Sequence, residues 1–211
     1  MTYTPFNPLD KQNLAESIMD AMLQCTPMQL PPNQFIGAGI YAIYYTGNFH
    51  LYERISTLNA NGAFRQPIYV GKAVPAGARM GGIDLGDNPG QALYSRLREH
   101  ASSINAVNNL SINDFFCRYL TVDDIWIPLA ESLLITKFAP LWNCCLDGFG
   151  NHAQGNGRNN QQKTKWDTLH PGRRWATNLQ ANDLTEEALT QQVRNFITTN
   201  YTPTQQEHGL A

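Results

Sequence analysis

Two short, mainly apolar segments that contain tyrosine constrain the fold more than any other part of this sequence. The first covers residues 39–45 (GIYAIYY) and the second covers residues 67–72 (PIYVGK). Both consist mainly of β-branched and aromatic residues and are bounded by turn formers, which predicts two short β-strands. Because side chains alternate along a strand, strands of this kind can bring two phenols to one surface of a small sheet.

The spacing of apolar residues predicts four helices and a third strand around these segments. Residues 48–66 are long for a hairpin loop, and we expect them to hold a small helix or turn of their own. Three prolines between positions 27 and 32 predict a linker through which no helix runs. The third strand is expected over residues 115–120. The helices are expected over residues 8–25, 91–104, 124–138 and 185–199, the third of them capped by Asp123-Asp124.

Composition places the chain among folded, loop-rich globular proteins. Its 211 residues suffice for one ordinary domain with some elaboration, and only 15% of them are charged. No apolar run is long enough to span a bilayer, and the N-terminus lacks the basic and apolar pattern of a secretion signal. The cysteines at positions 25, 117, 144 and 145 lack zinc-site spacing and form a poor disulfide pattern. We therefore expect reduced thiols in a cytoplasmic protein.

The distribution of charge favours a nucleic-acid partner, although the net charge is −2. Acidic residues concentrate near both ends of the chain, whereas residues 151–174 are basic. A local basic patch is what contact with phosphates requires. This segment contains Arg158, Lys163, Lys165, Arg173 and Arg174 against the single acidic residue Asp167.

Charged residues on two predicted helices allow both a structural and a functional interpretation. Arg96 and His100 lie four positions apart and therefore project from one side of their helix. Such a pair is normally part of a solvated helix face. Glu131 shares a helix face with apolar residues, where a carboxylate is costly unless it is paired or binds a cation. From the helix alone, pairing with an arginine is the favoured interpretation.

Two loop segments are open to two interpretations each. The glycine-rich residues 73–90, which include Arg79, fit either a mobile surface connection or a loop that approaches a DNA backbone closely. Residues 146–174 are first rich in Asn, Gln and Gly and then basic, with interleaved tryptophans. They fit either a polar loop anchored by its tryptophans or an extension that reads bases through arginine and amide side chains.

The order of these features resembles the GIY-YIG nuclease family. The first strand carries GIY at residues 39–41, and YVG at residues 69–71 corresponds to the second half of the signature. The resemblance covers roughly residues 37–143. Four longer stretches resemble the small type II restriction endonucleases of this family that recognise CCGCGG. They are residues 67–77 (PIYVGKAVPAG), 140–143 (PLWN), 147–152 (DGFGNH) and 170–173 (HPGR).

The resemblance implies an α+β fold of the GIY-YIG type, with a small three-stranded antiparallel sheet flanked by helices. We expect one compact domain with an N-terminal helical extension over residues 1–36 and a GIY-YIG core over residues 37–145. Residues 146–211 would form an extension for DNA recognition and dimerisation. The activity implied is hydrolysis of a DNA phosphodiester with one divalent ion. Mg²⁺ is the expected ion, with Mn²⁺ able to substitute.

The resemblance also implies which residues handle the metal and the phosphate. Glu131 is expected to bind the metal, and Arg96 is expected to hold the scissile phosphate. Tyr69 is expected to orient water or phosphate. Asn143 is expected to support Glu131 or the phosphate by hydrogen bonding.

Activation of the attacking water is expected to fall to three further residues. Tyr41 is the candidate general base, but a phenol with a pKa of about 10 needs help at neutral pH. His100 could accept the proton of Tyr41 or tune this phenol, and Lys72 could lower the pKa of Tyr41 if it lies close in the fold. How these three residues divide the work stays a hypothesis.

A six-base-pair palindrome implies two active sites related by a twofold axis. The expected assembly is therefore a homodimer, with a tetramer as the alternative. Double-stranded DNA is the expected substrate, a cognate DNA methyltransferase the expected genetic partner, and no membrane is expected. Lys72 and Arg79 are expected to contact phosphates. Base readout is expected from His152, Arg158, Asn159, Lys163, Lys165, Arg173 and Arg174.

Two other functions stay open from the sequence. A repair or mobile-element nuclease of this family usually carries a separate DNA-binding domain behind a linker, whereas this chain shows only embedded extensions. A non-catalytic DNA-binding module on the same fold has no need of the full set of site residues. That set is intact here and consists of Tyr41, Tyr69, Arg96, His100, Glu131 and Asn143. We therefore favour the restriction endonuclease.

Overall fold

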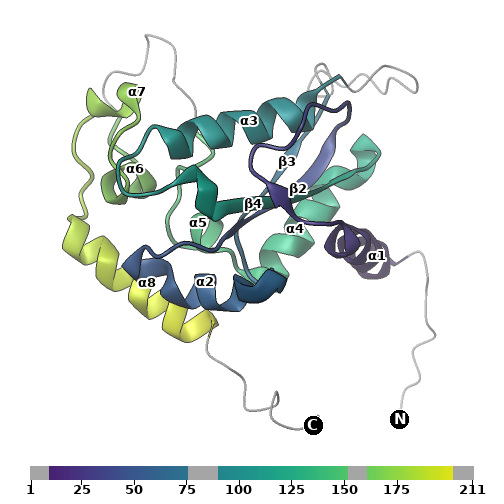
Figure 1. Ribbon diagram of the computed structural model, residues 1–211, viewed down its shortest axis with the longest axis horizontal. Helices are drawn as coiled ribbons and strands as arrows, with labels where there is room; N and C mark the ends of the chain where they lie inside the picture. Colours follow the sequence, from purple (N-terminus) through teal and green to yellow (C-terminus); the bar gives the residue numbers. More distant parts are fainter. Residues whose placement is uncertain (1–9, 76–89, 152–160, 202–211) are drawn as a thin grey trace, which may run out of the picture.

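A four-stranded antiparallel sheet lies at the centre of the fold (Figure 1). Its strands lie in the order β1 (Met28–Gln29), β4 (Phe115–Thr121), β2 (Gly39–Tyr45) and β3 (Pro67–Ala73). The computed structural model describes residues 10–75, 90–151 and 161–201. The two tyrosine-rich segments form β2 and β3, which pair directly, with Tyr41 opposite Gly71. The predicted α+β fold is confirmed.

The sheet has one strand more than the three that the sequence predicted. Strand β1 lies in the segment expected to be a proline linker, and it pairs with β4 so that Met28 is opposite Cys117. The amide of Gln29 donates to the backbone oxygens of Ile112 and Phe115, at 3.0 and 2.9 Å. A strand of two residues is too short to show an alternating pattern, which is why the sequence did not indicate it.

The four expected helices are present, although one begins differently. Asp10 caps α1 (Lys11–Gln24), because its carboxylate accepts a hydrogen bond from the Gln12 amide at 2.9 Å. The expected cap at Asp123-Asp124 does not form: the 3-10 turn η5 (Asp124–Trp126) intervenes, and α4 (Ile127–Phe138) begins without a side-chain cap. The other helices of the described ranges are α2 (Glu53–Asn59), α3 (Ala92–Asn105), α5 (Leu141–Cys144), α6 (Lys165–Leu169), α7 (Arg174–Thr177) and α8 (Glu186–Asn200), with 3-10 turns η1 (His50–Tyr52), η2 (Ala60–Gly62) and η4 (Ile112–Asp114).

Strand β2 separates two hydrophobic cores, because its side chains alternate between the two faces of the sheet and all are buried. Tyr41 and Tyr45 belong to the core that includes residues of α3, α5 and α8. Ile40 and Tyr44 belong to the core that includes residues of α1 and α4. Figure 1 shows these two groups of helices on opposite sides of the sheet. No helix in the described ranges is both long and apolar enough to cross a membrane.

A buried hydrogen-bonded network joins distant segments of the first core. Trp142 donates its Nε1 hydrogen to the Tyr52 hydroxyl at 3.0 Å, so the hydroxyl hydrogen of Tyr52 is directed at His170 Nε2. The Nδ1 atom of His170 then donates to Asn109 Oδ1 at 3.0 Å. Burial, together with the charge of Arg173, lowers the pKa of His170 to about 3. His170 is therefore neutral in the folded protein.

This network makes stability depend on pH in a defined direction. The pKa of His170 is about 3 in the folded protein and about 6.5 in an unfolded chain. Its contribution is therefore complete above pH 6.5 and is lost as the pH falls toward 3. At pH 5 we expect this residue to lower the free energy of unfolding by about 2 kcal/mol relative to pH 8. Urea unfolding of the wild type and of His170→Gln at both pH values measures this loss.

The His170→Gln variant should lose about 2 kcal/mol less than the wild type between these pH values. Substitution of the exposed His50 by glutamine is the matched control, because it removes a histidine that lies outside the buried network. Equal pH dependence in the wild type and in His170→Gln would contradict the assignment of a buried, neutral His170.

Candidate active site

Two tyrosines, a histidine and an arginine come together on the α3 side of the sheet. Tyr41 lies on the central strand β2 and Tyr69 on the edge strand β3, whereas Arg96 and His100 lie one turn apart on α3. The Tyr41 hydroxyl and His100 Nε2 form a buried hydrogen bond of 2.6 Å. The centroid of the Tyr69 ring lies 6.2 Å from that of Tyr41 and 5.1 Å from that of His100. The structure thus brings together four residues that the sequence selected.

The glycine of the second signature segment makes room for this cluster. Gly71 is opposite Tyr41 in the sheet, and a Cβ atom at Gly71 would lie only 2.6 Å from Tyr41 Cζ. Any larger residue would therefore push the phenol away from His100. The position requires glycine because of this close approach.

Arg96 is the positive charge next to both phenols. Burial raises the pKa of Tyr41 well above its ordinary value, and Tyr69 raises it further. Burial also raises the pKa of Tyr69. Arg96 opposes both shifts through its charge and through hydrogen bonding. Both phenols are therefore protonated at neutral pH, and Arg96 is the cation that limits the cost of ionising either one.

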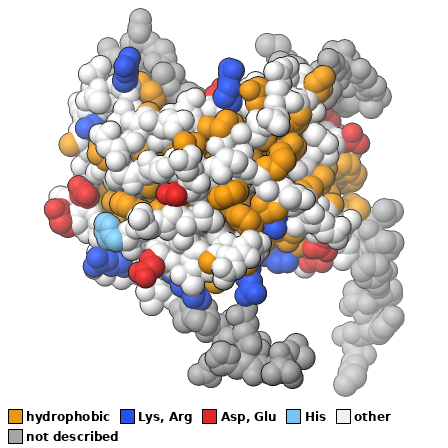
Figure 2. Space-filling view, in the orientation of Figure 1, with side chains coloured by type: hydrophobic (Ala, Val, Ile, Leu, Met, Phe, Trp, Pro, Cys, Tyr) orange, Lys and Arg blue, Asp and Glu red, His pale blue; other side chains and the backbone are white. Residues whose placement is uncertain are grey.

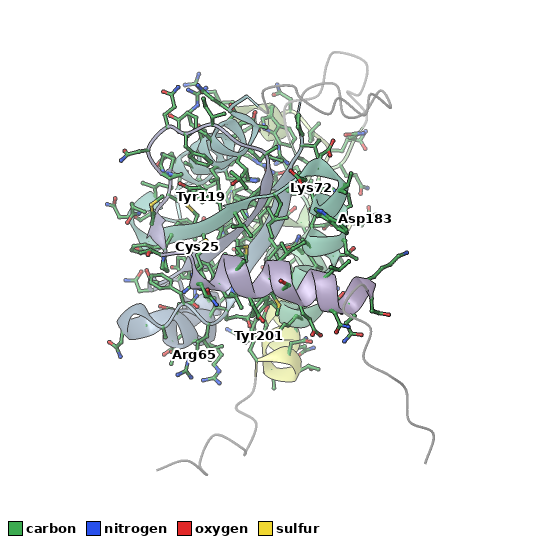
Figure 3. The ribbon with its side chains drawn as sticks, turned by 90° about the vertical axis from the view of Figure 1, so that its right-hand side faces the viewer. Cys25, Arg65, Lys72, Tyr119, Asp183 and Tyr201 are labelled. Atoms are coloured by element: carbon green, nitrogen blue, oxygen red, sulfur yellow. The ribbon has the colours of Figure 1, made fainter. Side chains whose placement is uncertain are left out.

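Lys72 and Glu131 form an ion pair on the other side of the edge strand. Lys72 is opposite Ile40 in the β2–β3 pairing, so its side chain points toward α4, which carries Glu131. Lys72 Nζ and Glu131 Oε2 are 2.8 Å apart, and 21% of the Glu131 side chain is exposed. Figure 3 shows Lys72 at the end of the sheet away from Arg65 and Tyr201. The partner of Glu131 is thus a lysine of β3 and not an arginine.

This ion pair changes the role expected for Lys72. The sequence suggested that Lys72 could lower the pKa of Tyr41, but Arg96 is the cation that does so. The charge of Glu131 raises the pKa of both Tyr41 and Tyr69. The carboxylate is therefore within electrostatic reach of the phenols, although it lies on the opposite side of β3.

Asn143 on α5 binds the backbone of the edge strand. Its Oδ1 accepts from the Val70 amide and its Nδ2 donates to the Val70 carbonyl, both at 2.8 Å. The side-chain amide thus satisfies the outward-facing groups of Val70 as a neighbouring strand would. Both polar atoms of the Asn143 side chain bond to Val70, where a bond to Glu131 was expected, and a contact with phosphate stays a prediction. Asn143 instead fixes the strand between Tyr69 and Lys72.

Residues 148–151, which the sequence predicted to be a loop and which lie within the DGFGNH stretch of the resemblance, cover the cluster. The Gly150 carbonyl accepts a hydrogen bond from Arg96 Nη2 at 2.8 Å. The Phe149 ring stacks on the His100 ring, with centroids 4.6 Å apart and planes 17° apart. Two glycines flanking a phenylalanine were the available signal, since such a pattern permits close approach of backbone to other groups. The distribution of charge and the helical spacing of the sequence do not indicate that this loop contacts the cluster.

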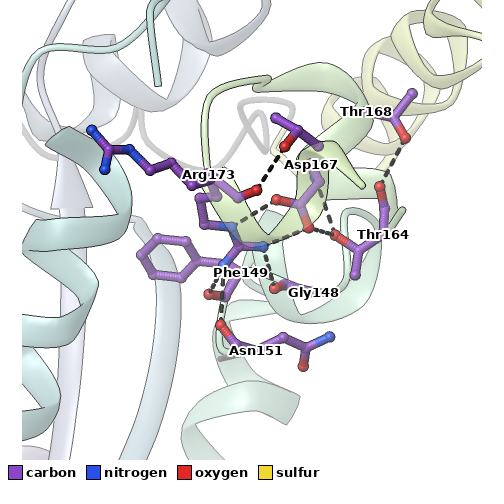
Figure 4. Close-up of polar contacts among 9 residues, drawn as sticks. Gly148, Phe149, Asn151, Thr164, Asp167, Thr168 and Arg173 are labelled. Carbon is purple, nitrogen blue, oxygen red and sulfur yellow. Dashed lines mark hydrogen bonds and ion pairs between the residues drawn. The ribbon is translucent and has the colours of Figure 1, made fainter. Parts of the chain in front are cut away.

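The residues of the loops and the C-terminal extension that were expected to contact DNA divide into three groups by their exposure. Arg174 is exposed on α7, while Lys163 and Lys165 are half-buried. Arg173 is only 3% exposed, and its guanidinium donates all five of its hydrogens within the protein (Figure 4). The structure therefore corrects the expected base contact of Arg173. The third group lies outside the described residues and consists of Arg79, His152, Arg158 and Asn159.

The described surface carries charges of both signs. On the face drawn in Figure 2, basic and acidic side chains are interspersed around the rim and hydrophobic atoms lie nearer its centre. The described residues on this face therefore do not form a continuous basic track of the kind that follows a DNA backbone.

Glu131 fits a site for a single hard cation. The described residues contain no group of three or more His, Cys, Asp or Glu side chains that could hold a metal ion. Glu131 is a partly exposed carboxylate. The ammonium group of Lys72 lies 2.8 Å from it, in a position where a metal cation could bind the carboxylate. Mg²⁺ commonly retains several waters and takes one or two carboxylates together with substrate phosphate. One glutamate is therefore a sufficient protein ligand.

Comparison with known proteins agrees with this geometry. The model of the Eco29kI GIY-YIG domain, a restriction endonuclease family, matches residues 33–197, well over half of the chain. The match includes both tyrosine strands, α3, α4 and the loop at residues 148–151. Among curated proteins, no significant match was found. The chain belongs to the Eco29kI GIY-YIG domain family and contains a nuclease domain of the restriction endonuclease type.

Proposed function

We propose that this protein is a type II restriction endonuclease that cleaves double-stranded DNA at a palindromic site, CCGCGG, with one divalent ion per active site. The observation that carries the proposal is the arrangement around β3. Tyr41, Tyr69, Arg96 and His100 lie on one side of an edge strand, and a partly exposed Glu131 lies on the other. A phosphodiester laid along this edge would face the partly exposed side chains of Arg96 and Glu131.

Arg96 is suited to bind the scissile phosphate. Its side chain is about one quarter exposed, and its guanidinium bears a full charge at any physiological pH. One of its nitrogens is held by the Gly150 carbonyl and another by Glu99 at 3.2 Å. These contacts orient the fork, so that little reorganisation is needed when negative charge develops on the phosphate. The Tyr69 hydroxyl, beside Arg96, can donate a hydrogen bond to the same phosphate.

Tyr41 and His100 together are suited to take a proton from the attacking water. The raised pKa of Tyr41 means that a free phenolate is scarce at neutral pH. A hydrogen bond of 2.6 Å to His100 Nε2 provides another route. The Tyr41 oxygen accepts the proton of the water while its own proton passes to His100 Nε2. This route requires neutral His100 with its hydrogen on Nδ1.

Glu131 would hold the divalent ion, for which Mg²⁺ is the proposed species and Mn²⁺ the substitute. When bound, such an ion stabilises negative charge on the phosphate and on the leaving oxygen. Lys72 is suited to move from the carboxylate to a phosphate oxygen of DNA, because 40% of its side chain is exposed. In that role Lys72 positions the backbone and does not act on Tyr41.

The symmetry of a palindromic target indicates how many copies of the protein would act together. Two copies related by a twofold axis would present one site to each strand, so we propose a homodimer, with a tetramer as the alternative. Base readout is assigned to the segment that contains Arg158 and Asn159, and further phosphate contact to Arg79. A cytoplasmic location and a cognate DNA methyltransferase as genetic partner complete the proposal.

The first prediction from the proposed function concerns Glu131. Incubation of plasmid DNA with Mg²⁺ and the wild-type protein should yield discrete fragments on a gel. Glu131→Gln should lower the cleavage rate by at least about 100-fold, because the neutral amide binds a divalent ion weakly. DNA binding, measured without divalent ions, should stay within about threefold of wild type.

Asp124→Asn is the matched control for this variant. It removes one negative charge from the exposed turn that precedes the same helix, and its side chain makes no capping bond. Cleavage by Asp124→Asn should equal that of wild type. Nicks that depend on DNA structure would instead indicate a repair function, and binding without any cleavage would indicate a non-catalytic module.

The second prediction separates a proton relay from a phenolate base. A phenolate of raised pKa would make kcat increase tenfold per pH unit between pH 8 and 9.5. The relay to His100 instead predicts a nearly constant kcat over this range. Tyr41→Phe should lower kcat at least about 100-fold at all these pH values. Single-turnover rates at saturating protein measure both effects.

Tyr44→Phe serves as the control for this series, since Tyr44 lies on the same strand but faces the opposite core. It should retain the wild-type kcat and the wild-type pH profile. A loss of only a few-fold in Tyr41→Phe would remove Tyr41 from its proposed role.

A further inference from the structure

Arg173 is the centre of a buried anchor behind the candidate site (Figure 4). Its Nε and Nη2 atoms each lie 2.7 Å from a carboxylate oxygen of Asp167. Asp167 is held in turn by the Thr164 hydroxyl at 2.7 Å. The guanidinium also lies over the rings of Trp166 and Trp175, at 4.5 and 4.6 Å from their centroids. The Arg173 side chain is therefore fixed in both direction and rotation.

The remaining hydrogens of Arg173 all bind one short segment of backbone. They are donated to the carbonyl oxygens of Gly148, Phe149 and Asn151, at 2.9, 3.0 and 3.1 Å. The carbonyl of Gly150 lies between these and is not bound by Arg173. It accepts instead from Arg96 at 2.8 Å. Three carbonyls of residues 148–151 thus bind the anchor, and the fourth binds the residue proposed to hold the phosphate.

The same segment packs directly against the other site residues. Phe149 stacks on His100. A Cβ atom at Gly150 would lie 2.7 Å from the Tyr69 hydroxyl and 3.3 Å from Arg96 Nη2. Residues 148–151 therefore touch three members of the cluster, and their position depends on Arg173.

We propose that Arg173 is a positioning residue for the nuclease site, an inference that rests on the function proposed above. It acts through residues 148–151 to set the orientation of the Arg96 guanidinium against Tyr69 and the phosphate. A lysine cannot replace it, because a single ammonium cannot reach one carboxylate and three carbonyls at once. A displacement of about 1 Å in a group that binds the reacting phosphate can cost about 100-fold in rate.

The test compares Arg173→Lys with the wild-type full chain on a plasmid that the wild type cuts. We expect kcat to fall between about 10-fold and 100-fold. We expect KM and metal-free DNA binding to stay within about threefold, because Arg173 does not touch DNA. A role confined to stability would lower the melting temperature but leave kcat of the folded fraction unchanged.

Arg118→Lys is the matched control. Arg118 is a half-buried arginine whose guanidinium also donates to backbone carbonyls, those of Cys25 and Phe64, and to the Tyr44 hydroxyl. These contacts lie on the opposite side of the sheet from Tyr41. Arg118→Lys should therefore retain the wild-type kcat even where its melting temperature is lowered.

Gly150→Ala provides a second variant that leaves the Asp167–Arg173 pair intact. Its methyl group would crowd Tyr69 and Arg96, so kcat should fall at least 10-fold while KM is retained. If Arg173→Lys does not fold, this variant decides the outcome. Wild-type kcat in folded Arg173→Lys, or in Gly150→Ala, overturns the positioning role alone. Absence of cleavage by the wild type would overturn the proposed function itself.

Discussion

The site depends on the fact that β3 is an edge strand whose side chains alternate in direction. Tyr69 and Lys72 are three residues apart, so they point to opposite faces of the sheet. In the middle of a sheet such residues could not meet one ligand, because other strands would separate them. At an edge, side chains of both faces are open to one ligand, as the proposed phosphodiester contact requires. Asn143 makes this arrangement stable, since its amide binds the backbone groups of Val70 that an edge would leave unpaired.

Around this edge, the phenols, Glu131 and Asp167 each lie near a positively charged side chain. Arg96 limits the rise in the pKa of the two phenols, whose burial strongly favours their neutral form. Lys72 neutralises Glu131 across 2.8 Å, and in the proposed function a divalent ion and DNA would take its place. Behind the cluster, the buried Asp167–Arg173 pair holds the segment that orients Arg96. Losing either partner of such a pair would leave a buried charge, which is strongly destabilising.

Much of the fold follows from local pattern in the sequence. The alternation and composition of residues 39–45 and 67–72 predicted β2 and β3 almost to the residue, and helical spacing predicted α1, α3, α4 and α8. Strand β1 was not predicted, because two residues carry no periodicity. The cap expected at Asp123-Asp124 failed because a 3-10 turn takes the chain into α4 first. The local sequence does not show whether the chain enters α4 directly from a capping residue or through a 3-10 turn.

The site was less predictable, because partners of charged residues are set by tertiary contacts. The spacing of Arg96 and His100 indicated a shared face, which the structure confirms. No pattern revealed that Lys72 would pair with Glu131, since they lie on different elements. Counting basic residues over 151–174 could not distinguish Arg173 from its exposed neighbour Arg174. In the structure Arg173 is buried, and its guanidinium makes five hydrogen bonds within the protein. The HPGR stretch therefore has a packing role: His170 is neutral in the core, and a Cβ at Gly172 would collide with the backbone of Ala106 and Val107.

The most direct measurement maps the ends of the fragments that the protein produces from sequenced DNA. If one nuclease site per copy acts in a twofold assembly on the proposed target, every end will fall within CCGCGG. The cut will then lie at the same position on each strand relative to the centre of the palindrome. Ends at another fixed palindrome would contradict the proposed target, and scattered ends would contradict site-specific cleavage.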